Sequence, residues 1–183
     1  PANERHRVTQ ILRSTENFRD DEIEVALELF DESLAGGEDY AFLGAFQVAD
    51  NSRLSTDDSA DGRWLMADGS RQSLQGFACY GATPATDRTY DLYWIAVDRR
   101  AQGSGCGSQL LTEVERRLEA LHARMLVVET SSRSDYTATR GFYLRRGYVE
   151  AARVREFYAP ADDRIILTKR FARSPRRGWG AVA

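Results

Sequence analysis

Apolar residues recur along the chain with two different periods, which divide it into strands and helices. Between residues 18 and 35 the apolar positions are three or four residues apart, which predicts a helix capped by Thr15 or Asn17 and ended by Gly36 and Gly37. Short apolar or alternating runs predict strands over residues 5–12, 40–49, 72–81, 90–97 and 124–131.

The second half of the chain contains a helix with a clear apolar stripe. The stripe follows three closely spaced glycines and consists of Leu110, Leu111, Val114, Leu118 and Leu121. A short helix over residues 137–146 ends at Gly147, and strands over residues 148–159 and 163–171 join at a Pro-Ala-Asp-Asp turn. Helical crossovers favour parallel pairing and hairpins favour antiparallel pairing. We therefore expect a mixed α/β fold, with a mainly antiparallel central sheet and helices on both faces.

Length and composition narrow the class of protein. The 183 residues, 42% hydrophobic and 29% charged, fit one globular domain, which we place at residues 1–171. A polar insertion over residues 50–71, with a short strand at 63–67, lies between two strands of this domain, and residues 172–183 form a basic tail. The net charge of −3 argues against nucleic acid as the main partner.

The sequence favours a cytoplasmic protein. No apolar run approaches the ~20 residues of a spanning helix, and the first ten residues lack the apolar segment of a secretory signal. Two cysteines, Cys79 and Cys106, do not make a disulfide framework, so we expect reduced thiols. Neither His6 nor His122 has a pattern of metal-ligand spacing around it, and no metal is expected. A homodimer is a candidate assembly, because dimers are the commonest soluble oligomers.

Three glycines lie where a predicted strand gives way to a helix. Gly103, Gly105 and Gly107 permit positive φ and close backbone approach, and the following helix start offers unpaired N–H groups and a positive dipole end. This arrangement would stabilise a pyrophosphate. The Walker pattern does not fit, because Ser108 and Gln109 stand where Lys and Ser or Thr are required. The spacing of "GSGCGS" also does not supply a dinucleotide fingerprint.

In its context the glycine loop resembles that of the GNAT superfamily, the GCN5-related N-acetyltransferases. The acetyl-CoA motif of that family, Arg/Gln-x-x-Gly-x-Gly/Ala, is matched by "QGSGCG" at residues 102–107, with Val97 five residues upstream. A downstream family signature, an aromatic-Tyr pair followed by Gly-aromatic, is matched by "FYLRRGY" at residues 142–148. The expected order of elements agrees over roughly residues 5–171.

The resemblance implies how acetyl-CoA is bound. The backbone of Ile95, Ala96 and Val97 would pair with the pantetheine arm where two parallel strands splay apart. The amides from Gln102 to Ser108 would hold the pyrophosphate; these residues are Gln102, Gly103, Ser104, Gly105, Cys106, Gly107 and Ser108. Cys106 stands where the family often has a branched apolar residue, and we interpret it as a small hydrophobe that packs the start of the helix.

The resemblance also implies an acid and leaves the base open. Tyr143 would be the general acid that protonates the leaving thiolate. Asp91 stands where the histone acetyltransferase branch keeps its glutamate, and Glu129 where the ribosomal-protein acetyltransferases keep theirs. A carboxylate that ends an apolar strand, as Glu129 does, should have a raised pKa, which suits a base. A water chain without a dedicated base is a third arrangement.

The function expected from the sequence is acetyl-CoA-dependent transfer of an acetyl group to a primary amine by direct attack. The oxyanion would be held by a backbone N–H near Val97. The acidic segment over residues 16–39 favours a small cationic acceptor. Two alternatives are a protein N-terminal or lysine acetyltransferase and a non-catalytic CoA-binding module.

Overall fold

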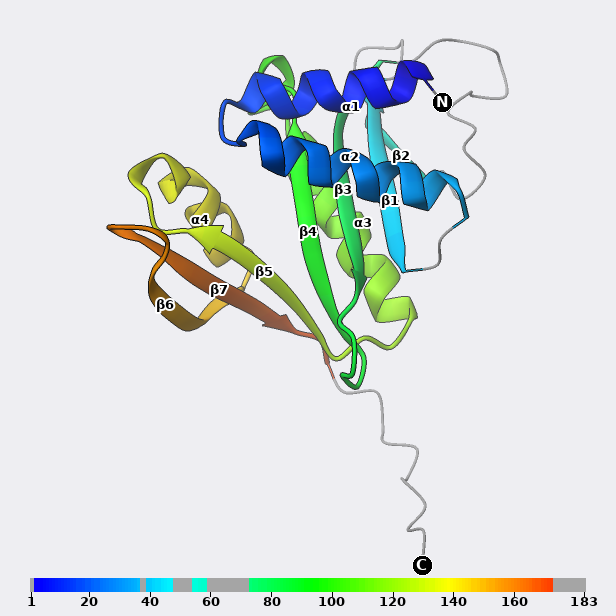
Figure 1. Cartoon of the computed structure of the whole chain (residues 1–183). Helices are drawn as coiled ribbons and strands as arrows, with labels where there is room; N and C mark the ends of the chain where they lie inside the picture. Colours follow the sequence, from blue (N-terminus) through cyan, green and yellow to red (C-terminus); the bar gives the residue numbers. More distant parts are fainter. Residues whose placement is uncertain (1, 37–38, 48–53, 59–72, 173–183) are drawn as a thin grey trace, which may run out of the picture. The chain divides into compact units, whose positions relative to one another are not determined.

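The computed structural model describes residues 2–36, 39–47, 54–58 and 73–172 (Figure 1). They fall into two units. The first comprises the described parts of Pro1–Ala82 with Leu92–Arg117, and the second Thr83–Asp91 with the described parts of Leu118–Ala183. The first unit holds the glycine loop, and the second holds the C-terminal hairpin.

The sheet of the first unit has the strand order β2-β1-β3-β4. These strands are β1 (Tyr40–Gln47), β2 (Leu54–Asp58), β3 (Leu74–Ala82) and β4 (Thr89–Val97), of which β4 belongs to this unit from Leu92 onward. β1 pairs antiparallel with both neighbours, for example Phe42 with Cys79 of β3. Helices α1 (Ala2–Thr15) and α2 (Asp20–Leu34) cover one face of this sheet, and α3 (Cys106–Ala120) lies on the other (Figure 1). β2 lies inside the predicted polar insertion, whereas the predicted strand at 63–67 lies outside the described residues.

The strand predicted over residues 5–12 is wrong, because this segment is part of helix α1. Its buried residues are Val8, Ile11 and Leu12, which are 1%, 0% and 0% exposed. That spacing of three and then one places all three side chains on one helix face, whereas a strand would turn Ile11 away from the other two. The period of the buried positions was helical, although the short apolar run was typical of a strand.

Helix α2 confirms the helix predicted over residues 18–35 but begins differently. The carboxylate of Glu22 accepts the backbone N–H of Arg19 at 2.8 Å, so Arg19 precedes the first turn. Neither predicted cap, Thr15 or Asn17, occupies that position, and Thr15 instead donates its hydroxyl to the carbonyl of Leu12 at 2.8 Å. The Glu22 carboxylate thus satisfies the N–H of the residue before the helix, as the Glu of a capping box does.

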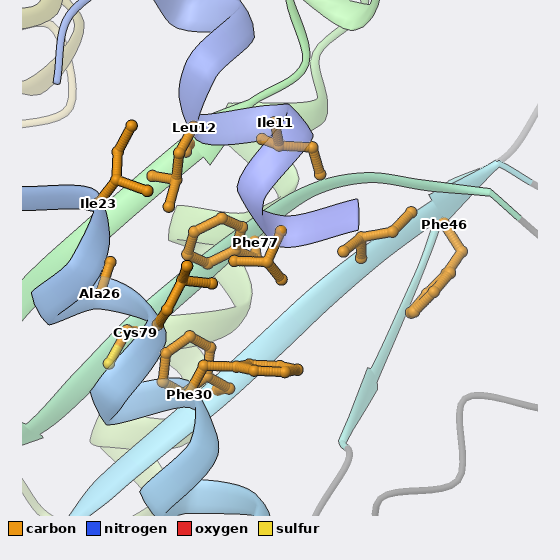
Figure 2. Close-up of a cluster of buried hydrophobic side chains, with 13 residues drawn as sticks. Ile11, Leu12, Ile23, Ala26, Phe30, Phe46, Phe77 and Cys79 are labelled. Atoms are coloured by element: carbon orange, nitrogen blue, oxygen red, sulfur yellow. The ribbon is translucent and has the colours of Figure 1, made fainter. Parts of the chain in front are cut away.

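Aromatic rings form the centre of the core between α1, α2 and the sheet (Figure 2). Phe30 of α2 meets the ring of Phe42 edge-on at 5.3 Å, and Phe42 stacks on Phe77 of β3 at 5.8 Å. Ile11 and Leu12 of α1 lie in the same cluster. Both N-terminal helices are therefore fixed to the sheet by one continuous apolar core.

The second unit confirms the predicted C-terminal half. It contains β5 (Met125–Ser131), α4 (Thr137–Leu144), β6 (Val149–Ala159) and β7 (Asp162–Arg170), with strand order β5-β7-β6. β7 pairs antiparallel with both neighbours, and β6 forms the exposed edge. Among the described residues no helix is both long and apolar enough to cross a membrane.

Two valine truncations test the placement of α1. Val8→Ala removes buried methyl groups from α1 and is expected to lower the free energy of unfolding by about 2 kcal/mol. Val25→Ala, on the exposed face of α2, should change it by about 0.5 kcal/mol or less, because Val25 is 46% exposed. Urea denaturation followed by circular dichroism measures both. An equal loss of unfolding free energy in the two variants would contradict the packing described for α1.

Candidate active site

The candidate cofactor loop begins where β4 ends, and Asp98 organises that end. Its backbone N–H donates to the carbonyl of Gln75 at 2.7 Å. Its own carbonyl accepts the N–H groups of Ala101 and Gln102 at 2.8 and 3.1 Å, which closes the short helix η1 (Arg99–Ala101). The side-chain amide of Gln102 reaches back to the carbonyl of Val97 at 3.4 Å. The chain therefore leaves the strand through a tightly bonded turn and enters the glycine loop in a fixed direction.

Two of the three glycines have the expected positive φ, whereas Gly107 lies within helix α3 without it. Gly103 and Gly105 have φ of +79° and +91°, a region that residues with a Cβ rarely adopt. A Cβ added at either position would meet nothing within 4 Å. The glycines are thus needed for conformation, and the space beside them is open enough for a ligand to approach the backbone.

Helix α3 begins directly after the loop. The N–H of Gln109 donates to the carbonyl of Gly105 at 3.0 Å, so the amides that precede Gln109 stand in the first turn, where an α-helix supplies no acceptors. Cys106, the first residue of α3, is 1% exposed. Burial raises the pKa of its thiol to about 11, as expected for a packing residue.

The three predicted pantetheine-binding residues lie at the end of β4. Ala96 is buried, and Ile95 and Val97 are partly buried. All the predicted cofactor-binding residues, from Ile95 to Ser108, lie in the first unit.

Tyr143 lies in α4 among aromatic rings. Phe142 and Tyr148 meet it edge-on at centroid distances of 5.2 and 5.3 Å, and its side chain is 2% exposed. Burial raises the pKa of the phenol well above its usual range, although the charge of Arg146 opposes this. Tyr143 therefore holds its proton at neutral pH, as a general acid must.

The two candidate bases have different surroundings. Asp91 is partly buried and accepts the hydroxyl of Thr83 at 2.7 Å. Glu129 forms an ion pair with Arg164 and is exposed. The reason is strand position: β5 is buried mainly on one face, and Glu129 points to the other.

Asp91, Glu129 and Tyr143 all belong to the second unit. Among the described residues, no hydrogen bond or ion pair joins any two of the three.

Comparisons with known proteins identify the family. The family model described as "Acetyltransferase (GNAT) domain" matches residues 60–150. An acetyltransferase structure of the GNAT family from Desulfovibrio desulfuricans is 36% identical in sequence, with a TM-score of 0.72. The match covers 93% of this chain and 94% of that one.

The chain belongs to the GNAT family of acetyltransferases. The predicted fold class, a mixed α/β fold of the GNAT type, is thereby confirmed, as is the expected enzyme class.

More distant GNAT structures share the fold. The ribosomal-protein-S18-alanine N-acetyltransferase from Escherichia coli is 18% identical, with a TM-score of 0.66 over 98% of this chain and 95% of that one. An aminoglycoside 6'-N-acetyltransferase, solved with coenzyme A, is 15% identical, with a TM-score of 0.63 over 94% and 93% of the two chains. No curated protein matches the sequence.

Two residues that shape the glycine loop, Asp98 and Arg7, were not predicted from the sequence. Asp98 lies between Val97 and the glycine motif, so its place next to the motif could have indicated a role in shaping the loop. Arg7, which donates to Asp98 at 2.7 Å, carried no local signal, because it comes from α1. Among the described residues, no group of three or more His, Cys, Asp and Glu side chains is arranged to hold a metal.

The buried thiols give a test of the packing around the loop. Cys79 and Cys106 are both free and buried, and burial raises the pKa of each thiol, so the thiolate fraction at pH 8 is very small. We expect the native protein to react with an aromatic disulfide reagent far more slowly than the urea-unfolded protein, in which both thiols should react. Rapid labelling of Cys106 in the native protein at pH 8 would contradict the packing described for it.

Proposed function

We propose that this GNAT protein transfers an acetyl group from acetyl-CoA to a primary amine of a small molecule. The observation that carries the proposal is the loop before α3, where Gly103 and Gly105 hold positive φ beside open space. A diphosphate bridge can approach such a backbone closely, and the start of α3 favours negative charge.

The residues in the loop would bind the co-substrate, and the backbone of Ile95 to Val97 would align its pantetheine arm. Attack of the neutral amine on the thioester carbonyl forms the new C–N bond, and the C–S bond then breaks. A backbone N–H near Val97 would stabilise the oxyanion. Tyr143 would give its proton to the departing thiolate, since burial keeps the phenol protonated.

Asp91 is the better-supported base. Its carboxylate accepts a neutral hydroxyl from Thr83, and among the described residues no cation pairs with it. Glu129, the second candidate, already pairs with Arg164. Protonation of Glu129 would break that ion pair, whereas Asp91 can take the amine proton without such a loss.

The proposed acceptor is cationic. Helix α2 carries Asp20, Asp21 and Glu22 in its first turn, of which Asp21 pairs with Arg19, and such an acidic surface raises the local concentration of cations. We further propose that residues 1–171 act as one catalytic domain, that the enzyme is a homodimer, and that it works in the cytoplasm. Its two free cysteines are consistent with a reducing compartment.

A pair of glycine substitutions tests the co-substrate site. Gly105→Glu places a carboxylate beside the proposed pyrophosphate and should weaken acetyl-CoA binding at least about 100-fold, because like charges in close contact repel. Gly36→Glu is the matched control, since Gly36 has a φ of +86° and equally open space but lies at the end of α2. Calorimetric titration with acetyl-CoA measures both variants.

Wild-type binding that is lost only in Gly105→Glu supports the site and justifies a screen of amines by thiol release. Equal weakening in both variants, or no binding by the wild type, would overturn it. Binding without turnover on small amines, N-terminal peptides or lysine peptides would favour the CoA-binding module.

Removal of one hydroxyl tests the acid. Tyr143→Phe should lower kcat by roughly 100-fold or more, with an unchanged Kd for acetyl-CoA, because the ring still packs while the proton donor is gone. Tyr148→Phe is the matched control, since Tyr148 is also 2% exposed and adjoins Tyr143. In the wild type, kcat should not fall between pH 8 and about 10 through loss of the Tyr143 proton, because its pKa is raised. If Tyr143→Phe keeps kcat within about threefold, another group supplies the proton.

A further inference from the structure

Helix α1 contacts the segment that leads into the glycine loop through two polar side chains. Arg7 and Ser14 are seven residues apart, which is two helical turns, so they lie on one face of α1. Arg7 donates to the carboxylate of Asp98, and the hydroxyl of Ser14 accepts the backbone N–H of Arg99 at 3.2 Å. An exposed ion pair between Arg99 and Glu16, at 2.8 Å, lies at the same end of α1.

The guanidinium of Arg7 joins three elements. Its Nη2 donates to Oδ2 of Asp98 at 2.7 Å, and its Nε donates to the carbonyl of Leu74 at 2.9 Å. The two acceptors lie just after β4 and at the start of β3, so one planar group fixes α1 against both strands.

Asp98 connects Arg7 to the glycine loop through hydrogen bonds. While Oδ2 binds Arg7, Oδ1 accepts the backbone N–H of Arg100 at 2.9 Å. The carbonyl of Asp98 binds the amides of Ala101 and Gln102, and Gly103 follows at once. Every hydrogen-bonding group of Asp98 is thus used to set the path of the chain into the glycine loop.

The pair differs from the ion pair that joins Arg5 of α1 to Asp31 of α2. The side chains of Arg7 and Asp98 are 25% and 9% exposed, whereas those of Arg5 and Asp31 are 48% and 49% exposed. Burying a charge pair costs solvation, and an apolar pair of similar size often gives equal stability. The apolar face of α1 already attaches the helix to the core, so the Arg7–Asp98 pair is better explained by the geometry it imposes.

We propose that Arg7 and Asp98 are positioning residues for the co-substrate: they hold the loop amides in the arrangement that receives the pyrophosphate of CoA. The inference rests on the proposed acetyl-CoA site. It assigns helix α1, far away in the sequence, a role in co-substrate affinity.

A double-mutant cycle tests the pair. Arg7→Met keeps the apolar stem and removes the guanidinium, and Asp98→Asn keeps an acceptor for the Arg100 N–H and removes the charge. Each should raise the Kd for CoA at least about tenfold, because displaced amides no longer converge on the pyrophosphate. The double variant should bind about as weakly as either single variant, because both changes break one interaction. Arg5→Met, which breaks the exposed pair with Asp31, is the matched control and should bind CoA as the wild type does.

A second ligand separates positioning from general destabilisation. Pantetheine lacks the pyrophosphate, so Arg7→Met should leave its binding, measured by ligand-observed NMR, unchanged. All measurements are made below the unfolding temperature of each variant. If Arg7→Met does not fold, Asp98→Asn and Arg7→Lys carry the test. A lysine ammonium cannot span the Leu74 carbonyl and the Asp98 carboxylate as a guanidinium does, so Arg7→Lys should also weaken CoA binding.

The outcomes separate the two proposals. If the wild type does not bind CoA, the proposed site fails and the inference fails with it. If the wild type binds CoA and both Arg7→Met and Asp98→Asn bind it equally well, the site stands and the positioning role is overturned. Equal weakening of CoA and pantetheine binding would also overturn it, since the effect would then not concern the pyrophosphate.

Discussion

In the first unit, β3 lies so close to the end of β4 and the start of α3 at position 76 that only glycine fits there. A Cβ at position 76 of β3 would lie 2.8 Å from the carbonyl oxygen of Ala96, 3.1 Å from the sulfur of Cys106 and 3.2 Å from a methyl of Leu110. Because Gly76 has no side chain, the carbonyl of Ala96 in the neighbouring strand β4 and the start of α3 can both approach β3 closely. The chain must then pass from Ala96 to Cys106 in a short connection, and that connection is the glycine loop. This connection turns at Asp98 and contains the positive φ values of Gly103 and Gly105.

Burial acts on the pKa of three groups near the proposed active site, but the net shift is upward for two of them and downward for the third. The thiol of Cys106 and the phenol of Tyr143 are both removed from water, and for Tyr143 this outweighs the opposing charge of Arg146, so the pKa of each rises and each stays neutral. Burial would also raise the pKa of Asp98, but the hydrogen bonds from the Arg100 amide and Arg7 outweigh it and lower that pKa. Cys106 is thus an unreactive packing residue, Tyr143 holds a transferable proton, and Asp98 remains charged and anchors the loop.

The sequence predicted those features that are encoded locally. The glycine loop, the stripe of α3 and the C-terminal hairpin each lie within a short stretch, and the structure has all three, except that Leu121 of the predicted stripe lies beyond the end of α3 and is 56% exposed. The family assignment rested on residues 102–107 and 142–148 and is confirmed. Helix α1 was predicted as a strand, because eight residues around a short apolar run do not distinguish the two periods. Its helical character depends on the contact of Val8, Ile11 and Leu12 with a core formed by later residues. Similarly, the exposure of Glu129 depends on which face of β5 is covered, which the strand itself does not specify.

The features that escaped prediction are contacts between distant parts of the chain. Arg7 and Asp98 are 91 residues apart, and neither belongs to a recognisable motif. A motif specifies which backbone amides face a ligand, but their positions depend on what holds the ends of the loop. Here one end is fixed by the intrahelical bond from Gln109 to Gly105, which the α3 sequence encodes, and the other by a guanidinium from the N-terminal helix. The glycine motif can therefore be preserved in a chain while its geometry changes through a single substitution in α1.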